Sequence, residues 1–78
     1  QPLFVSYNCQ IDDLAKLGND NQHYRFQLGN LSAIAFNFAY KFPNLKIGDK
    51  INIVYHLAWN YFNGRKSGQL KIIDIKYE

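Results

Sequence analysis

The sequence has few of the covalent and metal cross-links that stabilise many small proteins. Its 78 residues include a single cysteine, Cys9, so an intrachain disulfide and a thiolate zinc cluster are both excluded. A lone cysteine fits a reducing, cytoplasmic setting. No apolar run approaches the roughly 18 residues of a membrane span, and no charged-then-apolar signal region opens the chain. The sequence therefore predicts a cytoplasmic protein with no membrane partner.

Methionine is missing altogether, and charged residues are scarce. Because no Met is present, Gln1 is not a natural start, and we expect the chain to be a piece of a longer protein. Its length suits one small domain covering residues 1–78. At 47% hydrophobic and 19% charged, the chain is too apolar to be a disordered tail. Nine Lys and Arg against six Asp and Glu give a net charge of +3, which mildly favours polyanionic partners.

Aromatic rings, in contrast, are abundant. Six Phe, six Tyr and one Trp can fill a core larger than the chain length suggests. Apolar and polar residues alternate with a period of two along most of the chain, and this alternation indicates β-strands. The predicted strands cover residues 5–11, 23–28, 31–36, 51–61 and 65–77. In the first of them Cys9 alternates with the core residues, which predicts a buried and unreactive thiol.

Two tight turns join neighbouring strands. Gly29-Asn30 follows the second predicted strand, and Asn63-Gly64 separates the last two, where a type I′ hairpin turn needs positive φ at both central positions. The second turn also predicts the register, in which Trp59 faces Gly68 and the indole lies across the missing side chain. The same register places five apolar residues on one face of the hairpin, and we expect this apolar stripe to lie inside the protein: Tyr55, Leu57, Trp59, Leu70 and Ile72.

The alternation stops between residues 37 and 47. Phe38, Phe42 and Leu45 recur there at spacings of four and three, which predicts one or two helical turns with their rings packed under the sheet. Five strands with a short helical insertion between the third and the fourth is the element order of the OB-fold, a five-stranded, partly open Greek-key barrel. We therefore predict an all-β OB-fold. An SH3-like barrel, with shorter strands and no helix at this point, is the alternative.

One long segment carries a resemblance to a known family. Residues 60–75, NYFNGRKSGQLKIIDI, resemble the end of the OB domain of RecJ-type single-strand-specific exonucleases, in which Asn, Gly, Gln-Leu and Asp-Ile recur at this spacing. Four shorter stretches are similar to other parts of that domain: QPLF at 1–4, QHYRF at 22–26, AIAF at 33–36 and IGDK at 47–50. The sequence departs from the family pattern at Gln1, where Glu is common, and at Gly68, where a larger residue is common.

The resemblance implies a function for the longer protein and a narrower one for this piece. It implies a bacterial 5′-to-3′ exonuclease that acts on single-stranded DNA in recombination and mismatch repair, with a separate catalytic core that carries Mn²⁺ or Mg²⁺. None of that core is present. The two histidines, His23 and His56, are 33 positions apart with no carboxylate cluster beside them, so a two-metal hydrolytic site cannot be assembled. We expect a binding module that is not itself an enzyme and needs no cofactor.

Single-stranded DNA is the expected ligand of this module. Binding a single strand without sequence preference needs cations along the phosphates and exposed rings on which bases stack. In an OB-fold the ligand lies over the second and third strands and the two loops that flank them. The candidate residues are His23 and Arg25 in the second strand, Tyr61, Phe62, Arg65 and Lys66 around the last turn, and Lys71 on the polar face of the last hairpin.

Each candidate also has a purely structural interpretation. Arg25 is placed to pair with Asp20 as well as with a phosphate, and His23 reads as a plain polar residue. The hairpin tip has the alternative of folding its rings onto the barrel, and the register favours core packing for Trp59 over stacking. The alternative function is a protein-interaction barrel that docks on its own catalytic core or on a single-strand-binding protein.

Overall fold

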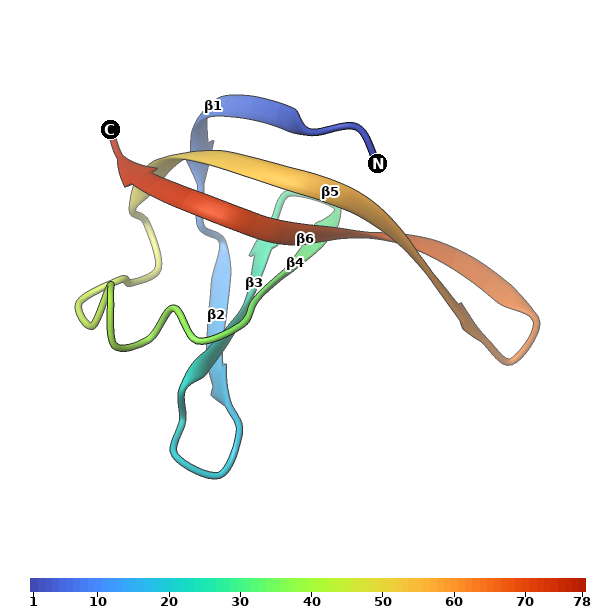
Figure 1. Ribbon diagram of the computed structural model, residues 1–78, viewed down its shortest axis with the longest axis horizontal. Coiled ribbons are helices and arrows are strands. Elements are labelled where there is room, and N and C mark those ends of the chain that lie inside the picture. Colours follow the sequence, from blue (N-terminus) through green and yellow to red (C-terminus); the bar gives the residue numbers. More distant parts are fainter.

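The computed structural model describes residues 1–78, apart from the side chain of Phe62, which lies outside the described part. Six strands form one sheet, and the described residues include no helix and hence none that would span a membrane (Figure 1). The strands are β1 (Phe4–Gln10), β2 (Asp13–Leu17), β3 (His23–Leu28), β4 (Leu31–Ala35), β5 (Lys50–Phe62) and β6 (Arg65–Tyr77). The all-β class is as predicted, but the prediction of five strands with a helical insertion is wrong.

The sixth strand arises because the chain changes partner at the end of the first predicted strand and continues as β2, a segment that was not predicted as a strand. The Ile11 N–H donates to the carbonyl of Asp49 at 2.9 Å, just before β5, whereas the Asp12 N–H donates to the carbonyl of Gln27 in β3 at 2.8 Å. The chain before Ile11 therefore pairs with β5, and the chain after Asp12 pairs with β3. The sheet order is β1-β5-β6-β4-β3-β2, so the two edge strands are consecutive in sequence. The result is a curled, open sheet and not a closed five-stranded barrel.

A bulge in β1 reverses the face on which its first residues lie. Between Ser6 and Cys9 the pairing with β5 shifts by one residue, and Asn8 takes a positive φ of 56°. Asparagine adopts this left-handed conformation more readily than most residues. The extra residue turns Val5 and Tyr7 toward solvent, where they are 51% and 75% exposed, while Cys9 is half-buried. The predicted alternation placed Val5 and Tyr7 on the same face as Cys9 and Ile11, and this prediction is wrong for Val5 and Tyr7.

The β5–β6 hairpin has the predicted turn and register. Asn63 and Gly64 both have positive φ, 50° and 75°, and Trp59 faces Gly68. The register holds from the turn to the pair Tyr55 and Ile72, after which a bulge shifts it by one residue. A positive φ at both turn positions is what a type I′ hairpin requires. The turn chemistry alone was therefore enough to predict the pairing of most of this hairpin.

The apolar stripe of this hairpin is only partly inside the protein. Leu70 and Ile72 are buried at 3% and 6% exposure, but Leu57 is 42% exposed and Trp59 is 57% exposed. The prediction of a buried Leu57 and Trp59 is wrong because both strands extend past their neighbours. β4 pairs with β6 only at 69–71 and β1 pairs with β5 no further than residue 55, so neither of these strands covers the stripe nearer the tip.

The connector of residues 36–49 contains turns where helical turns were predicted. The Phe42 N–H donates to the carbonyl of Phe38 at 2.9 Å, which makes one isolated helical hydrogen bond. The Ala39 N–H instead donates to the carbonyl of Gln22 at 3.1 Å, and Pro43 has no N–H to continue a helix. One turn that is not extended is too costly to form a helix by itself. The connector nevertheless covers one end of the sheet, as the buried Leu45 shows.

Tyr24 joins this connector to the core. Its side chain is fully buried, next to Phe26 in a core of twelve residues, and its hydroxyl donates to the carbonyl of Phe42 at 2.6 Å. Burial raises the pKa of the Tyr24 phenol, with a smaller contribution from the phenol of Tyr77. The hydroxyl is therefore a hydrogen-bond donor at neutral pH and ties the connector to β3.

Removing this hydroxyl should measurably destabilise the protein. Tyr24→Phe keeps the ring and leaves the carbonyl of Phe42 without its donor, which should lower the free energy of unfolding by about 1–2 kcal/mol. The measurement is urea denaturation, with Tyr40→Phe as the matched control because Tyr40 is 71% exposed. The control should change stability by less than about 0.5 kcal/mol. Equal stabilities for the two variants would contradict the role given to the Tyr24 hydroxyl.

Candidate nucleic-acid interface

Two cations and an apolar side chain form one row across the outer face of the sheet. In the strand register Arg25 faces Ile34, Ile34 faces Lys71, and Lys71 faces His56. Neighbouring strands lie about 4.8 Å apart, so the backbones of Arg25 and Lys71 are separated by about 10 Å. The side chains of Arg25 and Lys71 are exposed. The Nδ1–H of His56 donates a hydrogen bond to the carbonyl of Pro2 at 2.9 Å. We call Arg25, Ile34 and Lys71 the outer row.

Neither cation of the outer row is used in an ion pair among the described residues. The salt bridge found there joins Lys46 to Asp49 at 2.9 Å, in the connector. Hydrogen bonds from Lys46 hold the pKa of Asp49 below its usual value. Arg25 therefore does not form the alternative pair with Asp20. The two cations of the outer row stay available to an anionic ligand.

Two carboxylates mark the limits of this basic surface. Asp13 in β2 faces Gln27, and Asp74 in β6 faces Val54, so both lie on the outer side of the sheet. Each accepts a hydrogen bond from the N–H of the residue that follows it, at 2.9 Å. Phosphates are repelled by both groups. The cations of the outer row, on β3 and β6, thus lie between these two carboxylates.

His23 supports an aromatic ring at one end of the outer row. Its ring lies edge-on to that of Phe36, with centroids 5.2 Å apart, and its Nδ1 accepts a hydrogen bond from the Asn37 N–H at 2.9 Å. Phe36 is 51% exposed and is the residue that follows buried Ala35. His23 thus positions the chain after β4, and Phe36 is an exposed ring two residues beyond Ile34 of the outer row. Sequence reasoning missed Phe36, although strict alternation from Ala35 would have placed it outward.

The predicted residues of the hairpin divide between its two faces. Arg65 and Lys71 are an even number of positions apart with no bulge between them, so Arg65 lies on the outer face. Tyr61 and Lys66 face each other and lie on the opposite, inner face, which continues toward the barrel as Leu70. The seven predicted residues therefore do not line a single groove. Phe62 was also predicted to bind DNA, and its side chain lies outside the described residues.

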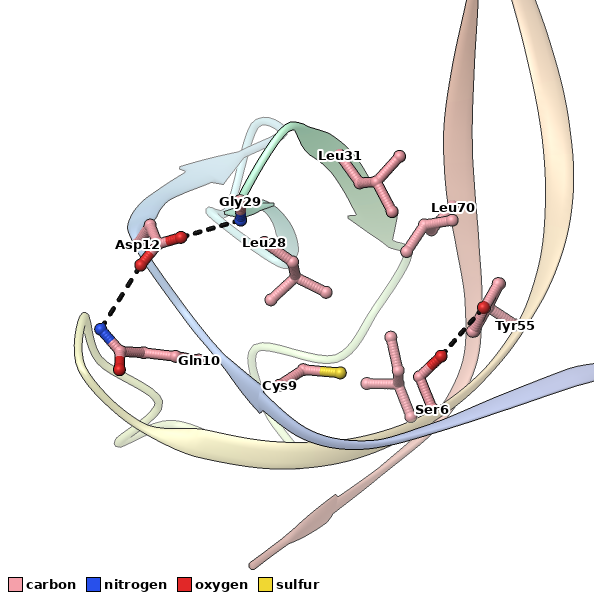
Figure 2. Close-up of a pocket in the computed structure, with 10 residues that line it drawn as sticks. Ser6, Cys9, Gln10, Asp12, Leu28, Gly29, Leu31, Tyr55 and Leu70 are labelled. Carbon is pink, nitrogen blue, oxygen red and sulfur yellow. Dashed lines mark hydrogen bonds between the residues drawn. The ribbon is translucent and has the colours of Figure 1, made fainter.

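A cavity of about 340 Å³ opens between β1 and the β3–β4 turn (Figure 2). Its wall is mainly aliphatic, with Leu28, Leu31 and Leu70 opposite Cys9. The carboxylate of Asp12 accepts a hydrogen bond from the Gly29 N–H at 2.8 Å and so serves the turn. The cavity is therefore the gap left by the open sheet, and Asp12, the charged residue that lines it, is hydrogen-bonded to Gln10 and Gly29.

Cys9, at the edge of this cavity, should react slowly with alkylating reagents. Burial raises the pKa of its thiol, and its S–H points to the carbonyl of Tyr7 at 3.8 Å. A raised pKa lowers the fraction of thiolate, which is the reactive form. We expect iodoacetamide at pH 8 to modify the folded protein several-fold more slowly than the urea-unfolded chain, as followed by mass spectrometry. Equal rates would mean that the thiol is open and unperturbed.

The described residues bring no three His, Cys, Asp or Glu side chains together as metal ligands. The outer face presents cations, hydrogen-bonding amides and an exposed ring. This matches what a single nucleic-acid strand requires of a protein surface.

A family model described as the RecJ OB domain matches residues 1–74. The chain belongs to the RecJ OB domain family. This confirms the resemblance found in residues 1–4, 22–26, 33–36, 47–50 and 60–75. No curated protein matches the chain in sequence.

Solved structures with this fold include single-stranded DNA-binding proteins and RecJ itself. The second single-stranded DNA-binding protein, SSBb, of Mycobacterium smegmatis superposes with a TM-score of 0.81 at 20% identity, over 100% of this OB domain and 87% of that chain. RecJ with Mg²⁺ from Thermus thermophilus gives 0.72 at 19% identity, over 99% of this domain and 12% of that chain. A small single-stranded DNA-binding protein of Streptomyces coelicolor gives 0.68 at 13% identity, over 99% and 94%. These likenesses show a shared OB-like fold.

Proposed function

We propose that this OB domain binds single-stranded DNA for a RecJ-like 5′-to-3′ exonuclease of bacterial recombination and repair. The observation that carries the proposal is the outer row, in which Arg25 and Lys71 stand across β3, β4 and β6 in a chain of the RecJ OB family. The catalytic core, with its Mn²⁺ or Mg²⁺, belongs to another part of the parent protein. A cytoplasmic setting agrees with this role and stays a prediction.

The outer face supplies each kind of contact that a single strand needs. Arg25, Lys71 and Arg65 offer positive charge along one side of the sheet, and Phe36 offers an exposed ring held by His23. Such a surface attracts phosphates through counterion release and accepts any base, since every base has a face that stacks. Binding without sequence preference is therefore the expected behaviour.

The outer row should determine part of the salt dependence of binding. Each phosphate neutralised on a single strand contributes about −0.7 to the slope of log K against log salt. Arg25→Ala combined with Lys71→Ala should therefore make the slope less steep by about 1.4 and weaken binding at low salt. The measurement is fluorescence anisotropy of labelled oligo-dT, titrated with the domain between about 50 and 200 mM NaCl.

The matched control for this double variant is Lys50→Ala combined with Lys76→Ala. It also lowers the net charge from +3 to +1, but both lysines lie at the open end of the β5–β6 hairpin, away from its turn. The control should keep the wild-type slope. If both double variants changed the slope equally, only net charge would matter, and the assignment of the outer row would be wrong.

The domain alone should leave DNA intact. Incubation with 5′-labelled single-stranded DNA and Mn²⁺ should give no shortened product on a denaturing gel, because the described residues hold no cluster of metal ligands. The control is the same incubation with EDTA. Metal-dependent shortening by the purified chain would show that the domain is more than a binding module.

A second candidate function is docking of a protein on another face. Val5 and Tyr7, turned outward by the bulge in β1, border a cavity of about 370 Å³ together with Val54. Exposed apolar surface of this kind suits the parent's catalytic core or a single-strand-binding protein. Apolar docking is insensitive to salt, so the titration that tests DNA binding also separates the two functions.

A further inference from the structure

β1 is an edge strand that carries no protecting charge. It is the first strand in the order of the sheet and pairs with β5 on one side only, and in Figure 1 it forms the upper rim of the sheet. Residues 1–11 contain no Asp, Glu, Lys, Arg or His, whereas the other edge strand, β2, carries Asp13 and Lys16, both exposed. Charged residues are one means by which edge strands avoid pairing with other chains. The domain therefore protects one edge of its sheet and leaves the other open to a further strand.

The first half of β1 is fixed against β5 by Tyr55. The ring of Phe4 stacks on that of Tyr55 with centroids 5.8 Å apart, and the hydroxyls of Ser6 and Tyr55 share a hydrogen bond of 3.0 Å. The bulge then ends this regular stretch, and the N–H of Asn8 donates to a side-chain oxygen of β5 at 2.9 Å. Residues 4–7 thus form an ordered edge, and the backbone groups on its outer side have no partner strand among the described residues.

The outer face beside this edge carries both a projecting ring and a hollow. Val5 faces Val54 across the two strands, and Tyr7 is 75% exposed. All three side chains border the hollow of about 370 Å³, together with the exposed Asp74 and Lys76 of β6. A ring and a hollow on one face, with one acid and one base beside them, are complementary to a second copy of the same face. A two-fold contact requires this kind of self-complementarity.

We infer that two copies of this domain associate through β1, with residues 4–7 of one copy antiparallel to residues 4–7 of the other about a two-fold axis. The sheet then continues from one copy into the next, and Val5 and Tyr7 of both copies lie on a single face. The ring of Tyr7 in each copy lies toward the hollow of the other. The inference goes beyond the proposed function and does not depend on DNA binding.

A second copy suits this edge in charge and in length. The domain as a whole carries a net charge of +3, which by itself repels another copy, but residues 4–7 are neutral, so no like charges face each other in the pair. The paired stretch has the same length in both copies because the same bulge ends it in each. A stable complex buries about 800 Å² on each partner, and a pair of four-residue strands is a smaller contact. We therefore expect a weak dimer, with a dissociation constant of about 0.1 mM.

Sedimentation equilibrium at increasing concentrations of the domain tests the inference. The wild-type domain should pass from monomer to dimer at about 0.1 mM. Added NaCl should leave the dimer intact, because backbone hydrogen bonds and apolar contacts hold it and salt screens the repulsion between the two net charges. DNA binding, in contrast, falls steeply with salt. The two kinds of binding are therefore measured independently.

Two pairs of variants locate the contact. Val5→Lys brings two ammonium groups together near the axis and should raise the dissociation constant at least about 10-fold. Ile47→Lys, which adds the same charge at a 58% exposed position of the connector, is the control and should dimerise as the wild type does. In a Cys9→Ser background, Val5→Cys should be cross-linked to a second copy by a short bismaleimide, whereas Ile47→Cys should not. Urea denaturation of each variant verifies that it is folded.

Two outcomes would overturn the inference. A wild-type domain that stays monomeric up to about 1 mM would show that the β1 edge does not pair with a second copy, and its face would then be left to a different protein. Equal dimerisation of Val5→Lys and Ile47→Lys, or equal cross-linking of the two cysteine variants, would place the contact on another surface. Absence of salt-dependent binding to oligo-dT would remove the proposed function and leave this inference standing.

Discussion

β6 is hydrogen-bonded on both sides, antiparallel to β5 and parallel to β4, and the surfaces of the domain depend on the register of these two pairings. In this register Leu70 lies inside between Ala33 and Leu57, and Lys71 lies outside beside Ile34. A slip of one residue would turn Lys71 into the core and Leu70 to solvent. Burying an unpaired ammonium is so unfavourable that the two pairings reinforce one another. The outer row depends on both pairings, because each of them places Lys71 on the outer face of the sheet.

The mismatch in strand length explains why the same hairpin is core at one end and surface at the other. β5 and β6 have 13 residues each, whereas β4 has five. Leu70 and Ile72 belong to the buried core cluster, together with Ala33 of β4 and Phe26 of β3. The stripe continues to Trp59, where neither β4 nor β1 extends far enough to cover it. An apolar pattern that runs the length of a strand therefore does not prove burial along all of it. Burial also requires a neighbouring element of the same length.

Sequence reasoning succeeded where the determining chemistry is local. The positive φ values at Asn63 and Gly64 follow from residue type, and the hairpin register follows from that turn. It failed where one residue switches conformation inside a regular pattern. Asn8 has a positive φ and lies in a bulge that the alternation of apolar and polar residues does not predict. The exposure of Trp59 was likewise hidden, because it depends on where β1 and β4 stop, and these limits are set by the chain as a whole.

Among the described residues, the cations of the outer row remain without ion-pair partners at little cost to stability. A surface ion pair contributes only about 0–1 kcal/mol, so leaving Arg25 and Lys71 without carboxylate partners sacrifices little. Each of them instead retains the capacity to neutralise a phosphate. A few such contacts give a single domain modest affinity, which falls steeply with salt. The domain covers 12% of the Thermus RecJ chain. Under the proposed function, a second contact made elsewhere in such a longer protein would raise the effective concentration of the strand at this surface. Under the proposed function, a small, weakly basic OB domain is sufficient as one of several tethered contacts on the same strand.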